Sequence, residues 1–320
     1  MTSQSPWLDQ AERILDQGGV VAIPTETVYG LAARIDRESG LQSIFRLKQR
    51  PFFDPLIVHV ADLQQLNAVV LQLPELACAL AETFWPGPLT LILEAHPQLN
   101  PLINSGLETV GVRIPRHPLS LELLRRTGPL AAPSANMFGR TSPTCAEHVQ
   151  SEFGSQVMVL DGGACELGIE STVLQVQSQE RRLVILRPGA VTDEDLRAFL
   201  TDRSDHFPDW ELKWRAGDPQ SPGHLTHHYQ PQQPLVIVGK NEDLATARED
   251  FSVSLSEMYE LVLAPSPQLA ARELYAQMRS LSQKPECKLI YVQASHKDST
   301  GLWSSIWDRL NRAATKNYLC

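Results

Sequence analysis

Apolar residues recur at two different intervals along the first two hundred residues, and the two intervals predict different elements. Helical spacing of three and four residues appears over residues 7–17, ends at Gly18-Gly19, and returns over residues 40–50. Short runs that are rich in β-branched residues and bounded by Gly or Pro are typical of strands. These runs lie at residues 20–24, 55–60, 88–93, 109–115, 156–161, 171–176 and 182–188. The mixture predicts one α/β domain with a large, mostly buried sheet.

The pattern changes near residue 201. Residues 204–233 are polar, rich in proline and without a sustained period, which predicts a linker between residues 1–203 and residues 234–320. Beyond this linker, strand-like runs alternate with helical stretches. The strand-like runs lie at residues 234–239, 259–265 and 288–294, and the helical stretches at 268–281 and 302–316. This alternation predicts a small parallel-sheet α/β domain at the end of the chain.

Length, charge and cysteine content narrow the class of protein. With 320 residues the chain is longer than one core usually serves, which agrees with two domains. A formal net charge of −9 argues against a main role in wrapping nucleic acid, but is compatible with a locally basic pocket. The five cysteines form no CxxC pair, so reduced thiols are expected rather than a disulfide framework or a zinc site. No signal peptide or membrane-spanning run is visible, and we expect a soluble, cytoplasmic protein.

Two cations, Lys48 and Arg50, lie two residues apart before a proline. Pro51 disfavours a helical Arg50, so this step is expected to be extended or to lie at a helix end. Two cations on one side of an extended segment could bracket a phosphate. A pair of solvated basic residues that ends a helix is the alternative, and the local sequence alone favours it.

Other polar groups follow apolar strands, where open α/β sheets bind ligands. They occur in "PTETVYG" (24–30), "PSAN" (133–136) and "GIESTVL" (168–174), and as the strand arginines Arg113 and Arg187. The cations among them suit a ligand with phosphates and carboxylates. Motifs of the P-loop, the dinucleotide-binding fold, the GxSxG elbow and the HExxH helix are not found in the sequence. The nearest approach to a metal motif is His224, His227 and His228, whose proline-rich surroundings favour contacts to a ligand over a metal cage.

These pieces together resemble the YrdC-like family, which contains the threonylcarbamoyl-AMP synthases. The motifs that carry the resemblance are "PTETVYGLAA", "KQRP…DPLIVHV", "WPGPLTLIL", "GVRIPRHP", "GPLAAPSANMFGRTSPT", "DGG…GIESTV" and "LRPG". "SPGHLTHHYQP" and "GLWSSIWDRLNRAATK" resemble the linker and the small accessory domain of the family's long form. The resemblance implies a mixed α/β fold, a twisted open sheet around a large concave cavity, followed by a small Rossmann-like α/β domain.

The resemblance also implies site residues. Those that match the family's nucleotide-binding positions are Lys48, Arg50, Ser134, Asn136 and Arg187, with Lys48 and Arg50 as the catalytic pair. His228 and Tyr229 match linker residues that close over ATP, so the linker is expected to act as a lid. Those that match threonine-binding positions are Thr25, His59, Arg113 and Ser171, with Arg113 as the expected carboxylate partner. Asp54 departs from the pattern, since the family usually has asparagine there.

The implied reaction joins L-threonine, bicarbonate and ATP to give threonylcarbamoyl-AMP and pyrophosphate, the first step of tRNA threonylcarbamoyladenosine modification. Mg²⁺ is expected to arrive with ATP and to have few protein ligands. A transferase that acts on tRNA is the expected partner, and no membrane is involved. The alternative is a double-stranded RNA-binding or ribosome-assembly factor of the same fold with weak RNA binding, which the negative charge disfavours. A hydrogenase-maturation carbamoyltransferase is less favoured still, because the chain has no CxxC zinc pairs.

Overall fold

The computed structural model describes residues 6–214, 228–294 and 300–319. Residues 215–227 of the predicted linker, which include His224 and His227, lie outside the described residues. Among the helices of the described residues, none is long and apolar enough to cross a membrane.

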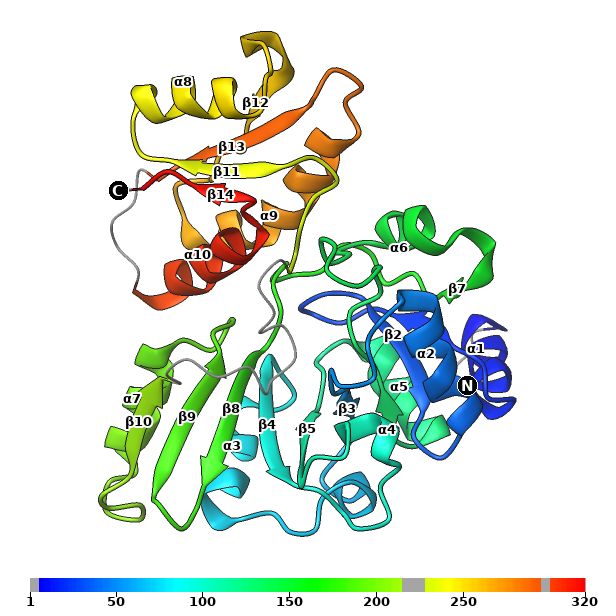
Figure 1. The fold of residues 1–320 in the computed structure, drawn as a ribbon. Coiled ribbons are helices and arrows are strands. Elements are labelled where there is room, and N and C mark those ends of the chain that lie inside the picture. Colours follow the sequence, from blue (N-terminus) through cyan, green and yellow to red (C-terminus); the bar gives the residue numbers. More distant parts are fainter. Residues whose placement is uncertain (1–5, 215–227, 295–299, 320) are drawn as a thin grey trace.

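A ten-stranded mixed sheet forms the larger part of the molecule (Figure 1), with strand order β10-β9-β8-β4-β5-β3-β6-β2-β1-β7. Its strands are β1 (Val21–Ile23), β2 (Gly30–Arg34), β3 (Ile57–His59), β4 (Leu89–Glu94), β5 (Thr109–Arg113), β6 (Leu130–Ala131), β7 (Met158–Val159), β8 (Thr172–Gln177), β9 (Arg182–Arg187) and β10 (Glu211–Trp214). Each of the seven runs predicted as strands in this region overlaps one of them, which confirms the predicted α/β sheet. The sequence pattern did not predict β2 or β10, and β10 lies within the segment expected to be a linker.

Helices flank this sheet. They are α1 (Pro6–Asp16), α2 (Glu38–Lys48), α3 (Glu75–Phe84), α4 (Pro101–Asn104), α5 (Pro118–Thr127), α6 (Ala146–Phe153) and α7 (Asp193–Asp202). The helices predicted over residues 7–17 and 40–50 are confirmed as α1 and α2. Gln49 adopts a left-handed backbone with φ of 51°, so α2 ends at Lys48, three residues before Pro51.

The small domain has a four-stranded sheet in the order β12-β13-β11-β14, and all its pairings are parallel, as predicted. Its strands are β11 (Leu235–Val238), β12 (Met258–Glu260), β13 (Leu289–Gln293) and β14 (Lys316–Asn317), and its helices are α8 (Asn241–Asp250), α9 (Pro267–Ser282) and α10 (Gly301–Ala313). β12 is shorter than the predicted run over residues 259–265, and Val262, in the part that is not strand, is 60% exposed. In Figure 1, α8 lies on the outer side of this sheet and α10 on the side that faces the large domain.

The two domains share part of their apolar interior. The main core cluster fills the large domain around β3, β4 and β5. A second cluster joins apolar side chains of α9, α10, β11 and β13 to Val28, Ile169 and Tyr229. Because Val28 and Ile169 belong to the large domain, burial of apolar surface holds the two domains together.

Leu91 in the middle of β4 is fully buried in the main core cluster. We expect Leu91→Ala to lower the free energy of unfolding by about 2–5 kcal/mol, because a cavity remains where the side chain was. Leu71, in the same domain, is 49% exposed, and Leu71→Ala should cost much less. Urea unfolding of both variants measures this, and equal losses would contradict the assigned packing of β4.

Candidate functional site

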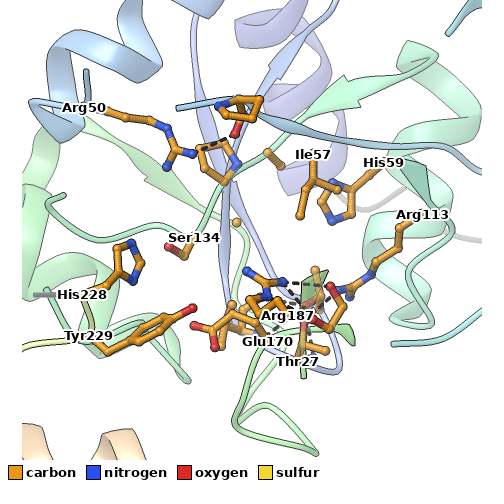
Figure 2. A pocket seen from close by; sticks show the side chains of 17 residues that line it. Thr27, Arg50, Ile57, His59, Arg113, Ser134, Glu170, Arg187, His228 and Tyr229 are labelled. Carbon is orange, nitrogen blue, oxygen red and sulfur yellow. Dashed lines mark hydrogen bonds between the residues drawn. The ribbon is translucent and has the colours of Figure 1, made fainter. Parts of the chain in front are cut away.

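A pocket lies where several strands of the large sheet begin or end (Figure 2). The parallel pairing of β3 and β5 places their last residues, His59 and Arg113, directly beside each other. β8 is antiparallel to β9, so the end of β9 at Arg187 lies at the start of β8, next to Ser171. The sheet register therefore gathers side chains that are far apart in the sequence.

Nine of the eleven site residues predicted from the sequence line this pocket. They are Thr25, His59, Arg113 and Ser171, and Arg50, Ser134, Arg187, His228 and Tyr229. Lys48 and Asn136 do not line it, but Lys48 Nζ donates hydrogen bonds to the carbonyl oxygens of Ser134 and Asn136, both at 2.5 Å. Thr27 and Glu170 also line the pocket. Their motifs were noted in the sequence as groups of polar residues, but neither residue was predicted to belong to the site.

Lys48 and Arg50 are both buried, with 1% and 8% exposure. The interpretation of a solvated basic pair is therefore wrong, although its placement at a helix end is right. Burial, and then the nearby charge of Arg50, lower the pKa of Lys48. The two carbonyl oxygens that accept from Lys48 Nζ keep the ammonium in place and tie the end of α2 to the loop at Ser134.

Arg50 is held by the turn that follows it. Its Nε donates to the Asp54 carbonyl oxygen at 3.0 Å, and its Nη2 donates to the Pro55 carbonyl oxygen at 2.8 Å. Nη2 also pairs with the Asp54 carboxylate at 2.9 Å. Burial raises the pKa of Asp54, while Arg50 and Lys48 act against that rise. The aspartate at this position thus orients Arg50 from within the turn that Pro51 begins.

Arg113 already has a carboxylate partner inside the chain. Its Nη2 pairs with Glu26 Oε1 at 3.1 Å, and its Nη1 donates to Thr27 Oγ1 at 3.0 Å. The other Glu26 oxygen accepts from the backbone N–H of Arg116 at 2.9 Å. Glu26 was not among the residues predicted for the site, and the carboxylate in "PTETVYG" was its only signal in the sequence. Any acid bound by Arg113 would share this guanidinium with Glu26.

Thr25 and Ser171 use their hydroxyls within the protein. Thr25 Oγ1 donates to the Val28 carbonyl oxygen at 2.6 Å, so it stabilises the turn after β1. Ser171 Oγ lies 2.8 Å from Thr90 Oγ1 and accepts from Arg187 Nη2 at 3.2 Å. Arg187 also donates to the Ser171 carbonyl oxygen through Nε at 3.2 Å and Nη2 at 2.9 Å. These contacts fix the wall of the pocket before a ligand binds.

Several buried polar atoms at the pocket have no hydrogen-bond partner within the described part of the protein. They are His59 Nδ1, Arg113 Nε, Asn136 Oδ1, His228 Nδ1 and Tyr229 Oη. Buried polar atoms are rarely left unsatisfied, so their concentration around one pocket indicates a ligand site. Tyr229 also holds a left-handed backbone with φ of 66°, which is unusual for an aromatic residue and common where function requires strain.

Among the described residues, no group of three or more His, Cys, Asp or Glu side chains could hold a metal ion. The carboxylates nearest the pocket are already paired: Asp54 with Arg50, Glu26 with Arg113, and Glu170 with Arg309. The arrangement offers cations and hydrogen-bond donors to an anionic ligand, and few oxygens to a metal.

Comparisons with known proteins agree along nearly the whole chain. A family model described as "Telomere recombination", covering Sua5, YciO and YrdC, matches residues 13–189, and a model described as "Threonylcarbamoyl-AMP synthase, C-terminal domain" matches residues 191–315. A threonylcarbamoyl-AMP synthase of Bacillus subtilis is 37% identical over 98% of this chain and 94% of its own length. One from Pyrococcus abyssi is 32% identical over 95% of this chain and 93% of its own. The crystal structure of P. abyssi Sua5 complexed with L-threonine has a TM-score of 0.83 and 30% identity, and covers 96% of this chain and 94% of that one.

His59 gives the pocket a measurable pH dependence. Burial, and then the charge of Arg113, lower its pKa from 6.5 to about 3. The neutral ring therefore stabilises the fold above pH 6.5, and this contribution is lost as the pH falls from 6.5 toward 3. Between pH 7.5 and pH 5, we expect the native protein to lose about 2 kcal/mol more unfolding free energy than His59→Gln.

Urea unfolding at the two pH values measures this difference. The exposed His206 supplies the matched control, and His206→Gln should keep the pH dependence of the native protein. An unchanged pH dependence in His59→Gln would contradict a buried neutral His59.

Proposed function

This chain belongs to the threonylcarbamoyl-AMP synthase family, in the long form that carries a C-terminal domain, and from this premise we propose how its pocket makes threonylcarbamoyl-AMP. The substrates are L-threonine, bicarbonate and ATP, and the products are threonylcarbamoyl-AMP and pyrophosphate. The observation that carries the proposal is the meeting of Arg50, Arg113 and Arg187 in one pocket, where several buried polar atoms have no hydrogen-bond partner among the described residues. Such a pocket suits a ligand that brings both phosphates and a carboxylate.

The phosphates of ATP belong to the side of the pocket formed by Lys48, Arg50, Ser134, Asn136 and Arg187. Two of the three ammonium protons of Lys48 are used on carbonyl oxygens, so its main contributions are its charge and the position of the Ser134 loop. Arg50 and Arg187 line the pocket directly and stabilise the negative charge on the oxygens around the phosphorus that is attacked. His228 and Tyr229 form the wall of the ATP site on the side of the small domain.

Threonine belongs to the opposite side, with Thr25, His59, Arg113 and Ser171. Arg113 binds its carboxylate, and Glu26 keeps the guanidinium oriented. His59 is neutral at physiological pH, because its pKa is about 3, so it can donate or accept one hydrogen bond without adding charge.

The threonine amine first combines with bicarbonate to form a carbamate: the new N–C bond forms, a C–O bond of bicarbonate breaks, and its hydroxide leaves with an amine proton as water. A carbamate oxygen then attacks the α-phosphorus, the new O–P bond forms, and the bond from the α-phosphorus to the bridging oxygen breaks to release pyrophosphate. Within this scheme the chain supplies position and charge stabilisation, and no covalent protein intermediate is needed.

Mg²⁺ accompanies ATP and neutralises part of the phosphate charge. The carboxylates at the pocket are engaged with arginines, which fits a metal held mainly by the triphosphate and water. A transferase that carries the threonylcarbamoyl group to tRNA, in the cytoplasm, would consume the product.

We propose a division of the chain into a catalytic domain over residues 1–203, a linker over 204–233 and an accessory domain over 234–320. The sharing of one apolar cluster between the first and last of these supports a fixed, docked arrangement. Of the linker proposed to act as a lid, residues 215–227 lie outside those described, while His228 and Tyr229 lie within them.

The first test of the reaction is pyrophosphate release with ATP, Mg²⁺ and bicarbonate, with and without L-threonine, using serine and glycine as controls. Lys48→Met should lower kcat/KM by about a hundredfold or more, because a buried charge behind the phosphate site is lost while the side-chain length is kept. Lys213→Met, which removes an exposed lysine from β10, serves as the matched control. Normal turnover in a folded Lys48→Met variant would contradict the role given to Lys48. Absence of pyrophosphate release by the native protein despite measurable ATP binding would favour the RNA-binding alternative.

Arg113→Lys tests the threonine side of the pocket. Lysine cannot contact Glu26, Thr27 and a substrate carboxylate together as a guanidinium can, so we expect the KM for threonine to rise by about tenfold or more. The KM for ATP should change much less. A rise confined to ATP would place the carboxylate site elsewhere.

A further inference from the structure

A fully buried arginine of the small domain reaches the back of the pocket. Arg309 on α10 has no exposed surface, and its Nε pairs with Glu170 Oε2 at 3.0 Å. Its Nη1 donates to the Pro188 carbonyl oxygen at 2.5 Å and pairs with Asp308 at 3.1 Å. Its guanidinium also lies over the ring of Tyr229, 5.5 Å from the centroid. One side chain of the second domain thus contacts two residues that line the pocket.

Glu170 is a carboxylate in the pocket wall, beside Arg187 (Figure 2). It accepts hydrogen bonds from Ser142 Oγ at 2.6 Å and from Tyr275 Oη at 2.9 Å, and Tyr275 belongs to α9 of the small domain. Burial alone would raise the pKa of Glu170, but the charges of Arg309 and Arg187 outweigh it and lower that pKa. Glu170 therefore remains an anion next to the site for an anionic ligand.

The contact between the domains is close along this whole wall. Ser305 Oγ on α10 donates to the Gly189 carbonyl oxygen at 2.8 Å. At Gly168 a Cβ atom would lie 2.5 Å from the Cα atom of Arg272 on α9, so only glycine permits this approach. Tyr229 is packed against the ring of Tyr275, with centroids 5.8 Å apart. The small domain is thus placed against the segments that carry Glu170 and Ser171.

An anion bound between Arg50 and Arg187 would be repelled by an unpaired Glu170 carboxylate. Loss of the Arg309 guanidinium alone would leave that carboxylate buried without this charge partner. With Arg309 in place the carboxylate is neutralised, and Tyr229 is held at the edge of the pocket.

We propose that Arg309 is a positioning residue through which the docked small domain makes the pocket able to bind a polyanion, by neutralising Glu170 and fixing Tyr229. The inference rests on the proposed function for the identity of that anion, the triphosphate of ATP. By linkage, bound ATP strengthens the docking of the small domain by the same factor by which docking strengthens ATP binding.

The test is a double-mutant cycle on the full-length protein, with the dissociation constant for Mg-ATP measured by calorimetry at about 0.15 M salt. Arg309→Met should weaken ATP binding by about tenfold or more when Glu170 is present. In a Glu170→Gln background the same change should weaken binding by less than about threefold, because there is no carboxylate left to neutralise. Glutamine keeps an oxygen for Ser142 and Tyr275, so the background preserves the packing of the wall.

Arg272→Met is the matched control, since this arginine lies on α9 at the same interface and its side chain is exposed. It should bind ATP as the native protein does. Thermal unfolding of each variant separates loss of folding from loss of affinity. Equal weakening by Arg309→Met in both backgrounds would mean a purely structural role and would overturn the proposal, and so would unchanged ATP affinity in Arg309→Met.

A failure of the proposed function can be distinguished from a failure of the inference about Arg309. A native protein that binds ATP but releases no pyrophosphate with threonine would contradict the reaction and leave the cycle readable. A native protein that does not bind ATP would overturn both. Protection of α10 from hydrogen exchange should rise when ATP is added to the native protein, and much less in Arg309→Met.

Discussion

The rest of the pocket depends on one constraint, the pairing of charges that are buried together. Lys48, Arg50, Arg113, Arg187 and Arg309 each have at most 8% of their surface exposed. A buried cation is costly unless carboxylates or carbonyl oxygens compensate for the water it has lost. Each of these cations therefore has an internal partner: carbonyl oxygens for Lys48 and Arg187, and carboxylates for Arg50, Arg113 and Arg309. The segments that supply the partners, rather than the cations alone, determine the shape of the site.

This pairing also determines what a ligand encounters. The guanidinium groups of Arg50 and Arg187 are already oriented by backbone carbonyl oxygens, so little reorganisation is needed when an anion binds. The internal carboxylates reduce the net positive charge but do not occupy every donor, as the unpartnered Arg113 Nε shows. Such a pocket attracts an anion less strongly than unpaired arginines would, but it holds its donors in fixed positions. Positioning of the reacting groups is the main requirement in a transfer at phosphorus.

The sequence predicted the fold wherever one signal dominated the local pattern. Strands rich in β-branched residues, such as β4 and β9, were predicted because their residues fit few other structures. β2 was not predicted, since its sequence "GLAAR" has little preference for strand and is held there by pairing with β1 and β6. β10 was also not predicted, because its residues look like the linker around them and only the pairing with β9 makes them a strand.

For the site, resemblance to a family predicted most residues that line the pocket, but the residues alone did not reveal their partners. Glu26 and Glu170 meet their arginines through the packing of distant segments and the docking of the small domain, which no local pattern contains. The burial of Lys48 was also hidden, because a helix-ending lysine before a proline usually faces water. Contacts between distant segments are decided by the whole fold, and local sequence carries little information about them.

The pairing of buried charges also explains why the small domain has a fixed position at the pocket. A linker that only tethered the small domain would leave Glu170 and Tyr229 exposed to water at the edge of the large sheet. In this chain both are covered, Glu170 by Arg309 and Tyr275, and Tyr229 by the ring of Tyr275. The apolar cluster that includes Val28 and Ile169 stabilises this contact. The buried ion pair makes it specific, since a displaced small domain would separate the Arg309 guanidinium from the Glu170 carboxylate. Apolar burial thus provides the affinity between the domains, and charge pairing fixes the position of the small domain relative to the pocket.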